Sequence, residues 1–98
     1  MLGTDKESNM AKSAWRIAEI TRSISNYVWK CFENADIVQQ DIDGAFCLVI
    51  SDLTIGEQKV LYDALRFRYT KDIYGMSVTR SNPEYGRAII VAVTKRED

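Results

Sequence analysis

Histidine is absent from the 98-residue chain, and cysteine and proline are scarce, with two residues and one residue respectively. The absence of histidine excludes Ser-His-Asp triads, Cys-His pairs and imidazole metal ligands. The two cysteines, Cys31 and Cys47, are too far apart in the sequence to make a zinc site, and we expect each to be a small buried side chain. We therefore expect no catalytic residue, no metal site and no cofactor in this chain.

The sequence also lacks a long apolar run and a secretory signal. The uncharged apolar run Gly44–Ile50 is far shorter than the ~20 residues that a membrane helix needs. Residues 1–10 are polar and mixed in charge, unlike a signal peptide. These features predict a protein that has no contact with a membrane and is not a secreted disulfide scaffold.

The residues that are present suit one small globular domain. Apolar residues make up 46% of the chain and charged residues 28%, which is ordinary for a globular fold and too apolar for a disordered chain. The length leaves no room for a second independent core. Residues 1–11 have no periodic apolar pattern and are expected to form a flexible tail, so the predicted domain covers residues 12–98.

Apolar residues spaced three and four apart predict a first helix over residues 11–34. Trp15 and Trp29 fall on another face of this helix, within about 40° of each other, with Arg22 between them. These two aromatics either form a protein contact surface or are covered by the tail. The apolar stripe expected to face the core consists of Ile17, Ile20, Ile24, Val28, Cys31 and Phe32.

A polar connector and a buried strand are predicted next. Residues 36–44 include Asp41 and Asp43, which we interpret as solvated turn residues rather than as metal ligands. The run 45–50, AFCLVI, has the length of a strand and lies between Asp-Gly and Ser-Asp. We expect this strand to be covered on both faces.

Thr54 and Glu57 form a capping-box pattern that starts a second helix, which is expected to end near Tyr69. Two β-branched runs, 76–80 and 87–94, follow and are joined by the turn sequence SNPEYG, which predicts a hairpin. The predicted fold is therefore α+β, in the order helix, strand, helix, strand, strand, with two helices packed on one face of a three-stranded sheet. The side chains of the second helix expected in the core are Val60, Leu61, Ala64 and Leu65.

The net charge of −1 hides an uneven distribution. Residues 1–52 carry five Lys or Arg against eight Asp or Glu, whereas residues 65–96 carry seven against two. A local excess of five positive charges favours a surface that faces a polyanion. The alternative is a solvated surface whose excess of positive charge has no ligand.

The second helix and the hairpin together suit single-stranded RNA, which is bound by cations along the phosphates and by aromatic faces under the bases. Tyr62 lies one turn from Gln58 and one turn from Arg66, so one exposed helix face should present a ring, an amide and a guanidinium. The alternative is that the Tyr62 ring packs beside the sheet and the arginines only keep the fold soluble. The candidate nucleic-acid-binding residues are Gln58, Lys59, Tyr62, Arg66, Arg80, Tyr85 and Arg87.

The segment LTIGEQKVLYDAL, followed by VTRSNPEYGRAIIVAVTK, resembles the R-three-H (Arg-xxx-His) family of single-stranded nucleic-acid-binding domains. The resemblance covers roughly residues 12–96, and its specific matches are concentrated in residues 53–95. The signature arginine of the family falls on Gln58 and the signature histidine on Tyr62, so neither is kept. Tyrosine at the second position is similar to the version of the domain within poly(A)-specific ribonucleases. Lys59 and Arg66 are then expected to supply the cations.

This resemblance implies a non-catalytic domain of an intracellular protein, nuclear, cytoplasmic or both, excised from a longer chain. The domain would bind single-stranded RNA, with poly(A) as one candidate, for a 3′-exoribonuclease (deadenylase) in the parent chain. The second hypothesis is a degenerate domain that has lost nucleic-acid binding and serves dimerisation or recruitment of a protein through the first helix. In that case Trp15 and Trp29 would be the contact residues.

Overall fold

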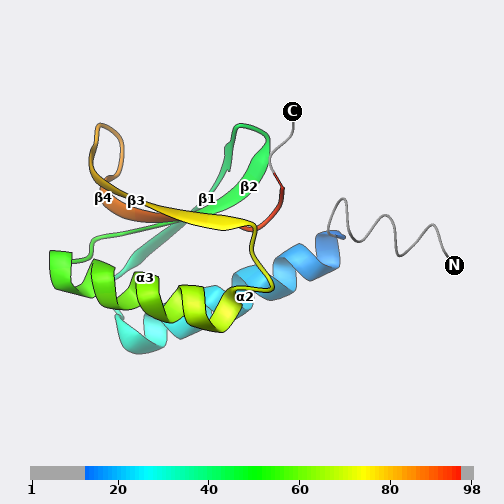
Figure 1. Cartoon of the computed structure of the whole chain (residues 1–98), viewed down its shortest axis with the longest axis horizontal. Helices are drawn as coiled ribbons and strands as arrows, with labels where there is room; N and C mark the ends of the chain where they lie inside the picture. The colour runs from blue at the N-terminus through cyan, green and yellow to red at the C-terminus, as the bar shows by residue number, and fades with distance from the viewer. Residues whose placement is uncertain (1–12, 96–98) are drawn as a thin grey trace, which may run out of the picture.

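The computed structural model describes residues 13–95 and has an α+β architecture, with two helices and a four-stranded antiparallel sheet (Figure 1). The sheet has the strand order β1-β2-β4-β3, and every neighbouring pair is antiparallel. In chain order the elements are α2 (Ala14–Cys31), β1 (Asp36–Ile42), β2 (Ala45–Ser51), α3 (Ile55–Tyr69), β3 (Gly75–Asn82) and β4 (Gly86–Ala92).

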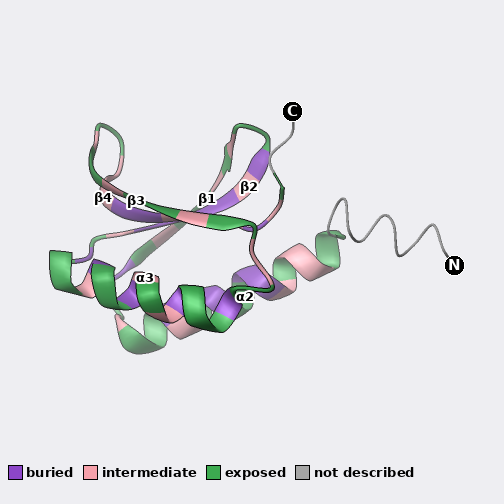
Figure 2. Cartoon of the chain, viewed as in Figure 1, coloured by how far each residue is buried: buried purple, intermediate pink, exposed green. Residues whose placement is uncertain are grey.

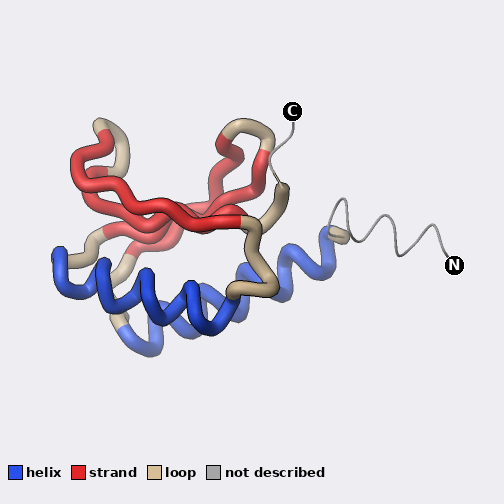
Figure 3. Tube along the Cα trace, viewed as in Figure 1, coloured by secondary structure: helices blue, strands red, loops and turns tan. Residues whose placement is uncertain are grey.

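Both helices cover the same face of the sheet, and both hairpin turns bend away from the helices (Figure 1, Figure 3). The core lies between the two layers, where buried residues of α2 and α3, purple in Figure 2, pack with buried residues of the strands. The central strands β2 and β4 supply most of the sheet's buried side chains, because each has a neighbour on both sides. The fully buried side chains with the largest volumes are Ile24, Leu48, Ile50, Leu61, Leu65 and Ile89.

The prediction of three strands is wrong, because the expected polar connector 36–44 contains β1 and a hairpin turn. Strand β1 pairs with β2 from Asp36↔Ser51 to Ile42↔Ala45. The two-residue turn uses Asp43 and Gly44, whose φ angles of 54° and 83° are those of a hairpin turn with the right twist for the strands. The apolar residues of this edge strand, Ile37, Val38 and Ile42, do not alternate with its polar ones, so sequence periodicity could not reveal it.

Helix α2 is shorter than the predicted range 11–34, since its N-cap is Ser13 and its last residue is Cys31. The hydroxyl oxygen of Ser13 accepts from the Arg16 amide over 3.2 Å and so satisfies one free donor of the first turn. Cys31 is exposed in this last turn, so its predicted burial is wrong, whereas the predicted burial of Cys47 on β2 is confirmed. The predicted flexible tail, residues 1–11, lies outside the described residues.

Helix α3 begins with the capping box that the sequence predicts. The hydroxyl oxygen of Thr54 accepts from the Glu57 amide over 3.1 Å, and the Glu57 carboxylate accepts from the Thr54 amide over 2.9 Å. The core face of the helix differs from the prediction, because Val60 is 61% exposed and Ala64 is only half-buried. The helix is rotated so that its buried residues are Gln58, Leu61, Leu65 and Tyr69.

The chain contains the same unit twice, a helix followed by a β-hairpin. Helix α2 precedes the hairpin β1–β2, and α3 precedes the hairpin β3–β4. The inner strands of the two hairpins, β2 and β4, pair with each other, so the sheet order β1-β2-β4-β3 has an approximate two-fold arrangement. As a result, the two helices run in opposite directions along the same face of the sheet (Figure 1).

Candidate nucleic-acid interface

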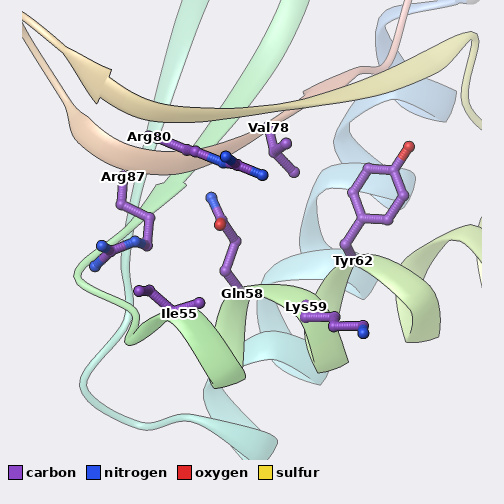
Figure 4. Close-up of a pocket in the computed structure, with 7 residues that line it drawn as sticks. All are labelled: Ile55, Gln58, Lys59, Tyr62, Val78, Arg80 and Arg87. Carbon is purple, nitrogen blue, oxygen red and sulfur yellow. The ribbon is translucent and has the colours of Figure 1, made fainter.

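A groove of about 760 Å³ opens between the first half of α3 and the strands β3 and β4. Figure 4 shows Gln58 and Tyr62 rising from the helix toward the strands, with Arg80 and Arg87 on the opposite wall. The residues that line the groove are Ile55, Gln58, Lys59, Tyr62, Val78, Arg80 and Arg87.

The regular spacing of the two elements explains why these side chains meet. On α3 the groove residues follow the spacing of one helix face, from Ile55 through Gln58 and Lys59 to Tyr62. On β3 the alternation of side chains places Val78 and Arg80 on the same face of the strand. The groove is therefore a property of the helix–hairpin unit and not of a loop.

Positive charge dominates the groove. Lys59, Arg80 and Arg87 line it, and its described lining includes no Asp or Glu. Both ion pairs among residues 13–95 are made elsewhere by Arg16, with Glu19 and, over 2.7 Å, with Asp72. The three groove cations are thus available to an anionic ligand.

Gln58 is not on the exposed helix face where the sequence analysis placed it. Its side chain is only 7% exposed and points into the space between α3 and the sheet. The amide nitrogen Nε2 donates to the backbone carbonyl of Thr79 over 3.0 Å and to that of Ala88 over 2.9 Å. Gln58 therefore ties the helix to the hairpin, in addition to lining the groove.

Tyr62 and Arg66 lie as predicted on the side of α3 that is open to solvent. The Tyr62 ring is half-buried, packs partly against the core and borders the groove. It also borders a smaller cavity of about 160 Å³ that Arg66 lines, so Arg66 lies beyond Tyr62 and outside the main groove. The ring thus packs beside the sheet and still presents a surface to the groove, so its role in binding a nucleic acid stays a prediction.

Tyr85 is separated from the other candidates, since it lies in the β3–β4 turn and is not part of the groove lining. The Asn82 carboxamide oxygen accepts from the amides of Glu84 and Tyr85 over 2.7 and 3.0 Å and so orders this turn. Burial, followed by the nearby Glu84 carboxylate, raises the pKa of Tyr85, and the Gln40 side chain of β1 opposes this increase. Tyr85 thus lies near Gln40 of the first hairpin and not in the groove beside α3.

Not all of the basic residues in the region 65–96 contribute to the groove. The Arg68 guanidinium lies 4.4 Å from the ring centroid of Tyr27 and makes a cation–π contact between the two helices. Tyr27 also meets the Tyr69 ring edge to face at 6.5 Å. Burial and the neighbouring Cys31 raise the pKa of Tyr27, while Arg68 lowers it. Of the basic residues in this region, Arg80 and Arg87 line the groove, Arg68 packs between the helices and Arg66 lines the smaller cavity.

Sequence reasoning missed the two apolar members of the groove, Ile55 and Val78. Both are exposed, at 68% and 45%, and so offer apolar surface beside the cations. The signal for Val78 was present, because it alternates with Arg80 along a predicted strand. Ile55 could not be assigned in this way, since the face that the first turn of a helix presents depends on how the helix packs.

The two tryptophans of α2 have different environments. Trp15 is 71% exposed, whereas the Trp29 indole N–H donates to the Ala35 carbonyl over 2.9 Å and joins the helix to the loop before β1. Trp29 and Arg22 line a second groove of about 650 Å³ between α2 and the first hairpin. This second groove is the counterpart of the cationic one in the approximate two-fold arrangement, and Arg22 is the only charged residue in its described lining.

No protein-family model matches the chain, and neither a curated protein nor a solved structure has significant similarity to it. Membership of the R-three-H family therefore stays a prediction. Among the described helices, neither is long and apolar enough to cross a membrane. Nor do the described residues bring together three carboxylate, thiol or imidazole side chains that could hold a metal ion.

Proposed function

We propose that this domain binds single-stranded RNA in the groove between α3 and the β3–β4 hairpin. The observation that carries the proposal is the composition of that groove, in which three cations without ion-pair partners in the described structure share the lining with a half-buried tyrosine ring. Arginine and lysine side chains bind phosphates, and a tyrosine face stacks on a base. A single strand offers both groups to the same groove, whereas in a duplex the base faces are stacked on each other.

The second groove, between α2 and the first hairpin, supports the proposed RNA site because its charge is different. Two grooves occupy equivalent places in the two helix–hairpin units, but one is lined by Lys59, Arg80 and Arg87 and the other by Arg22 alone. A charge excess that served only solubility would have no reason to gather in one of two equivalent grooves. The concentration of cations in one groove therefore supports a polyanionic ligand.

The domain itself is proposed to be non-catalytic, in the manner of the R-three-H family that the sequence resembles. In that proposal it holds single-stranded RNA, with poly(A) as one candidate, for a 3′-exoribonuclease carried elsewhere in an intracellular parent chain. Tyr62 occupies the position of the signature histidine and lies in the groove, and Lys59 supplies one of the cations. Gln58, at the position of the signature arginine, is turned toward the sheet instead.

Fluorescence anisotropy with a labelled single-stranded octanucleotide at two salt concentrations tests this function. We expect saturable binding that weakens with salt, because each phosphate contact releases counterions, with a slope of roughly −0.7 per contact for a single strand. The double variant Arg80→Ala/Arg87→Ala should lose most of the binding and reduce the slope by about 1.4. Arg22→Ala, which removes an exposed cation from the counterpart groove, is the matched control and should bind like the unaltered protein. Binding that is absent at low salt, or equal in all three proteins, would contradict the proposal.

A second candidate function, contact with a protein partner or a second copy through α2, is favoured by one observation. Trp15 is 71% exposed on the first turn of the helix, and tryptophan is a frequent anchor of protein interfaces. Trp29 is the weaker anchor, because its indole is already bonded to Ala35. If this function holds, sedimentation should show an oligomer that Trp15→Ala dissociates, and a monomer at high concentration would exclude self-association.

A further inference from the structure

We propose that Gln58 makes the groove selective for nucleobases that carry an exocyclic amine, in preference to uracil. This inference rests on the proposed RNA-binding function and concerns the same groove. It starts from the orientation of one carboxamide, that of Gln58, whose two ends face different parts of the structure. The amide nitrogen faces the sheet, while the side chain as a whole lines the groove.

The orientation of this carboxamide is fixed by its partners. A glutamine amide can usually be turned over without a change in shape, so its direction must follow from its hydrogen bonds. Here both protons of Nε2 are used, one by the Thr79 carbonyl at 3.0 Å and one by the Ala88 carbonyl at 2.9 Å. The reversed orientation would place the oxygen Oε1 against two carbonyl oxygens, which repel it. The acceptor end of Gln58 is therefore held away from the sheet.

The two carbonyls are themselves held in place by the hairpin. Thr79 and Ala88 face each other in the register of β3 and β4. The Thr79 hydroxyl donates to the Gly86 carbonyl over 2.7 Å and accepts from the Ala88 amide over 3.1 Å, just before the hairpin turn. The amide of Gln58 thus docks on an ordered part of the sheet, and its direction does not depend on a mobile loop.

The free end of Gln58 is an acceptor in a groove of donors. Among the described residues no donor bonds Oε1, and this oxygen is not sealed from solvent. The neighbouring Lys59, Arg80 and Arg87 side chains can only donate. A phosphate oxygen would be repelled by Oε1 and attracted by the cations, so the groove has separate places for phosphate and base. A base that stacks near Tyr62 and approaches Oε1 therefore gains a hydrogen bond there only if it offers a donor.

Bases differ in how well they can meet this acceptor. The amines of adenine, cytosine and guanine project beyond the ring. An amine N–H can therefore donate to Oε1 without bringing two carbonyl oxygens close to it. The one ring donor of uracil, N3–H, lies between two carbonyl oxygens that would approach Oε1 together with it. Because the Gln58 amide nitrogen is already used, it cannot rotate to donate to those carbonyls. The groove should consequently bind an amine-bearing base better than uracil.

The test uses octanucleotides of adenosine, cytidine, uridine and purine riboside, the last being adenosine without its amine. A neutral hydrogen bond is worth about 1 kcal/mol, so the unaltered protein should bind the adenosine and cytidine strands roughly 5-fold more tightly than the uridine strand. The purine riboside strand should bind more weakly than the adenosine strand by a similar factor. Because purine riboside stacks as adenine does, this comparison isolates the amine and needs no altered protein.

The matched variant is Gln58→Met, which keeps the approximate shape of the side chain and removes its acceptor together with the two bonds from Nε2 to the sheet carbonyls. In this variant adenosine and purine riboside strands should bind equally, and the conservative Gln58→Asn, which is too short to reach, should behave in the same way. Equal binding of adenosine and purine riboside by the unaltered protein would overturn the role of Gln58 while leaving RNA binding intact. If no strand binds with salt dependence, the proposed function fails and this inference fails with it.

Discussion

Tyr62 serves both the core and the groove, and substitutions at this one residue can separate the two roles. The ring packs partly against buried side chains, while its exposed part borders the groove. Tyr62→Phe keeps the ring and should leave RNA affinity within about two-fold. Tyr62→Leu keeps apolar bulk but removes the stacking face, which is worth roughly 1–3 kcal/mol per base.

Anisotropy titrations of Tyr62→Phe and Tyr62→Leu, with thermal melts of each variant, measure the two roles independently. We expect both variants to remain folded and only Tyr62→Leu to lose affinity, by roughly 5- to 150-fold. Equal affinities in two folded variants would show that the ring has only a packing role.

Gln58 illustrates how far single residues could be predicted from the sequence. Its place on α3 beside Tyr62 followed from helical spacing, but its burial did not, because a polar residue on a half-apolar helix is normally assigned to the solvent side. Only the two sheet carbonyls that accept from it make its burial favourable. Since those carbonyls belong to residues 21 and 30 positions later in the chain, no local pattern could have revealed the contact.

At the scale of elements, the start of α3 is the feature that places the groove residues of the helix. The capping box at Thr54 and Glu57 satisfies donors at the start of the helix, and its N-cap residue lies four positions before Gln58. Thr54→Ala should lower the free energy of unfolding by about 1 kcal/mol, as measured by urea denaturation. Thr54→Ser keeps the hydroxyl acceptor and is the control, so a loss of the same size in both variants would show that the cap is not responsible.

The β3–β4 hairpin, which carries Arg80 and Arg87, depends on the backbone of Gly86. This glycine has φ = 69°, a left-handed conformation that side chains with a Cβ adopt only with strain. Gly86→Ala should therefore cost about 1–2 kcal/mol of stability, although an added Cβ would meet no atom within 4 Å.

Gly75→Ala is the matched control for the hairpin. Gly75 also has open space around the position of a Cβ, and its φ is not in the left-handed region. Urea denaturation should show a lower free energy of unfolding for Gly86→Ala and an unchanged one for Gly75→Ala. Equal effects at the two glycines would mean that the hairpin does not depend on the left-handed turn residue.

Elements with a strong local signal were predicted well, and elements defined by their neighbours were not. The capping box, the buried strand 45–50 and the hairpin after residue 75 follow from composition and spacing. Strand β1 does not, since its mixture of polar and non-alternating apolar side chains suits an edge strand as well as a loop. Its one local signal is the Asp-Gly pair at 43–44, a turn sequence typical of two-residue hairpins. The same pair also suits the boundary of the buried strand 45–50.

At the scale of the whole molecule, the buried thiol of Cys47 connects stability with pH. Burial, followed by the nearby Asp41 carboxylate, raises the pKa of Cys47 above its ordinary value of 9.0. The folded state therefore favours the protonated thiol, so the stability from this group is complete below pH 9 and decreases as pH rises through the folded-state pKa. Tyr27 and Tyr85, whose pKa values are raised above 10.0, add losses of the same sign at higher pH.

Urea denaturation between pH 7 and pH 10 checks this dependence. The free energy of unfolding should be flat up to about pH 9 and then decrease. Cys47→Ala should lose part of the decrease, while Cys31→Ala, which removes the exposed thiol, should keep it. A stability that stays constant or rises above pH 9 would contradict the burial of Cys47.

The central claim is that single-stranded RNA binds in the cationic groove beside α3. The approximate two-fold arrangement provides a control within the same molecule, because the two similarly placed grooves differ in charge. A titration of the ¹⁵N-labelled protein with a single-stranded adenosine octanucleotide, followed by two-dimensional NMR, observes both grooves at once. The account predicts shifts for the amides around Gln58, Tyr62, Arg80 and Arg87. The indole signals of Trp15 and Trp29, on the other helix, should stay in place. Shifts confined to α2 and its tryptophans, or none at all at low salt, would contradict the account.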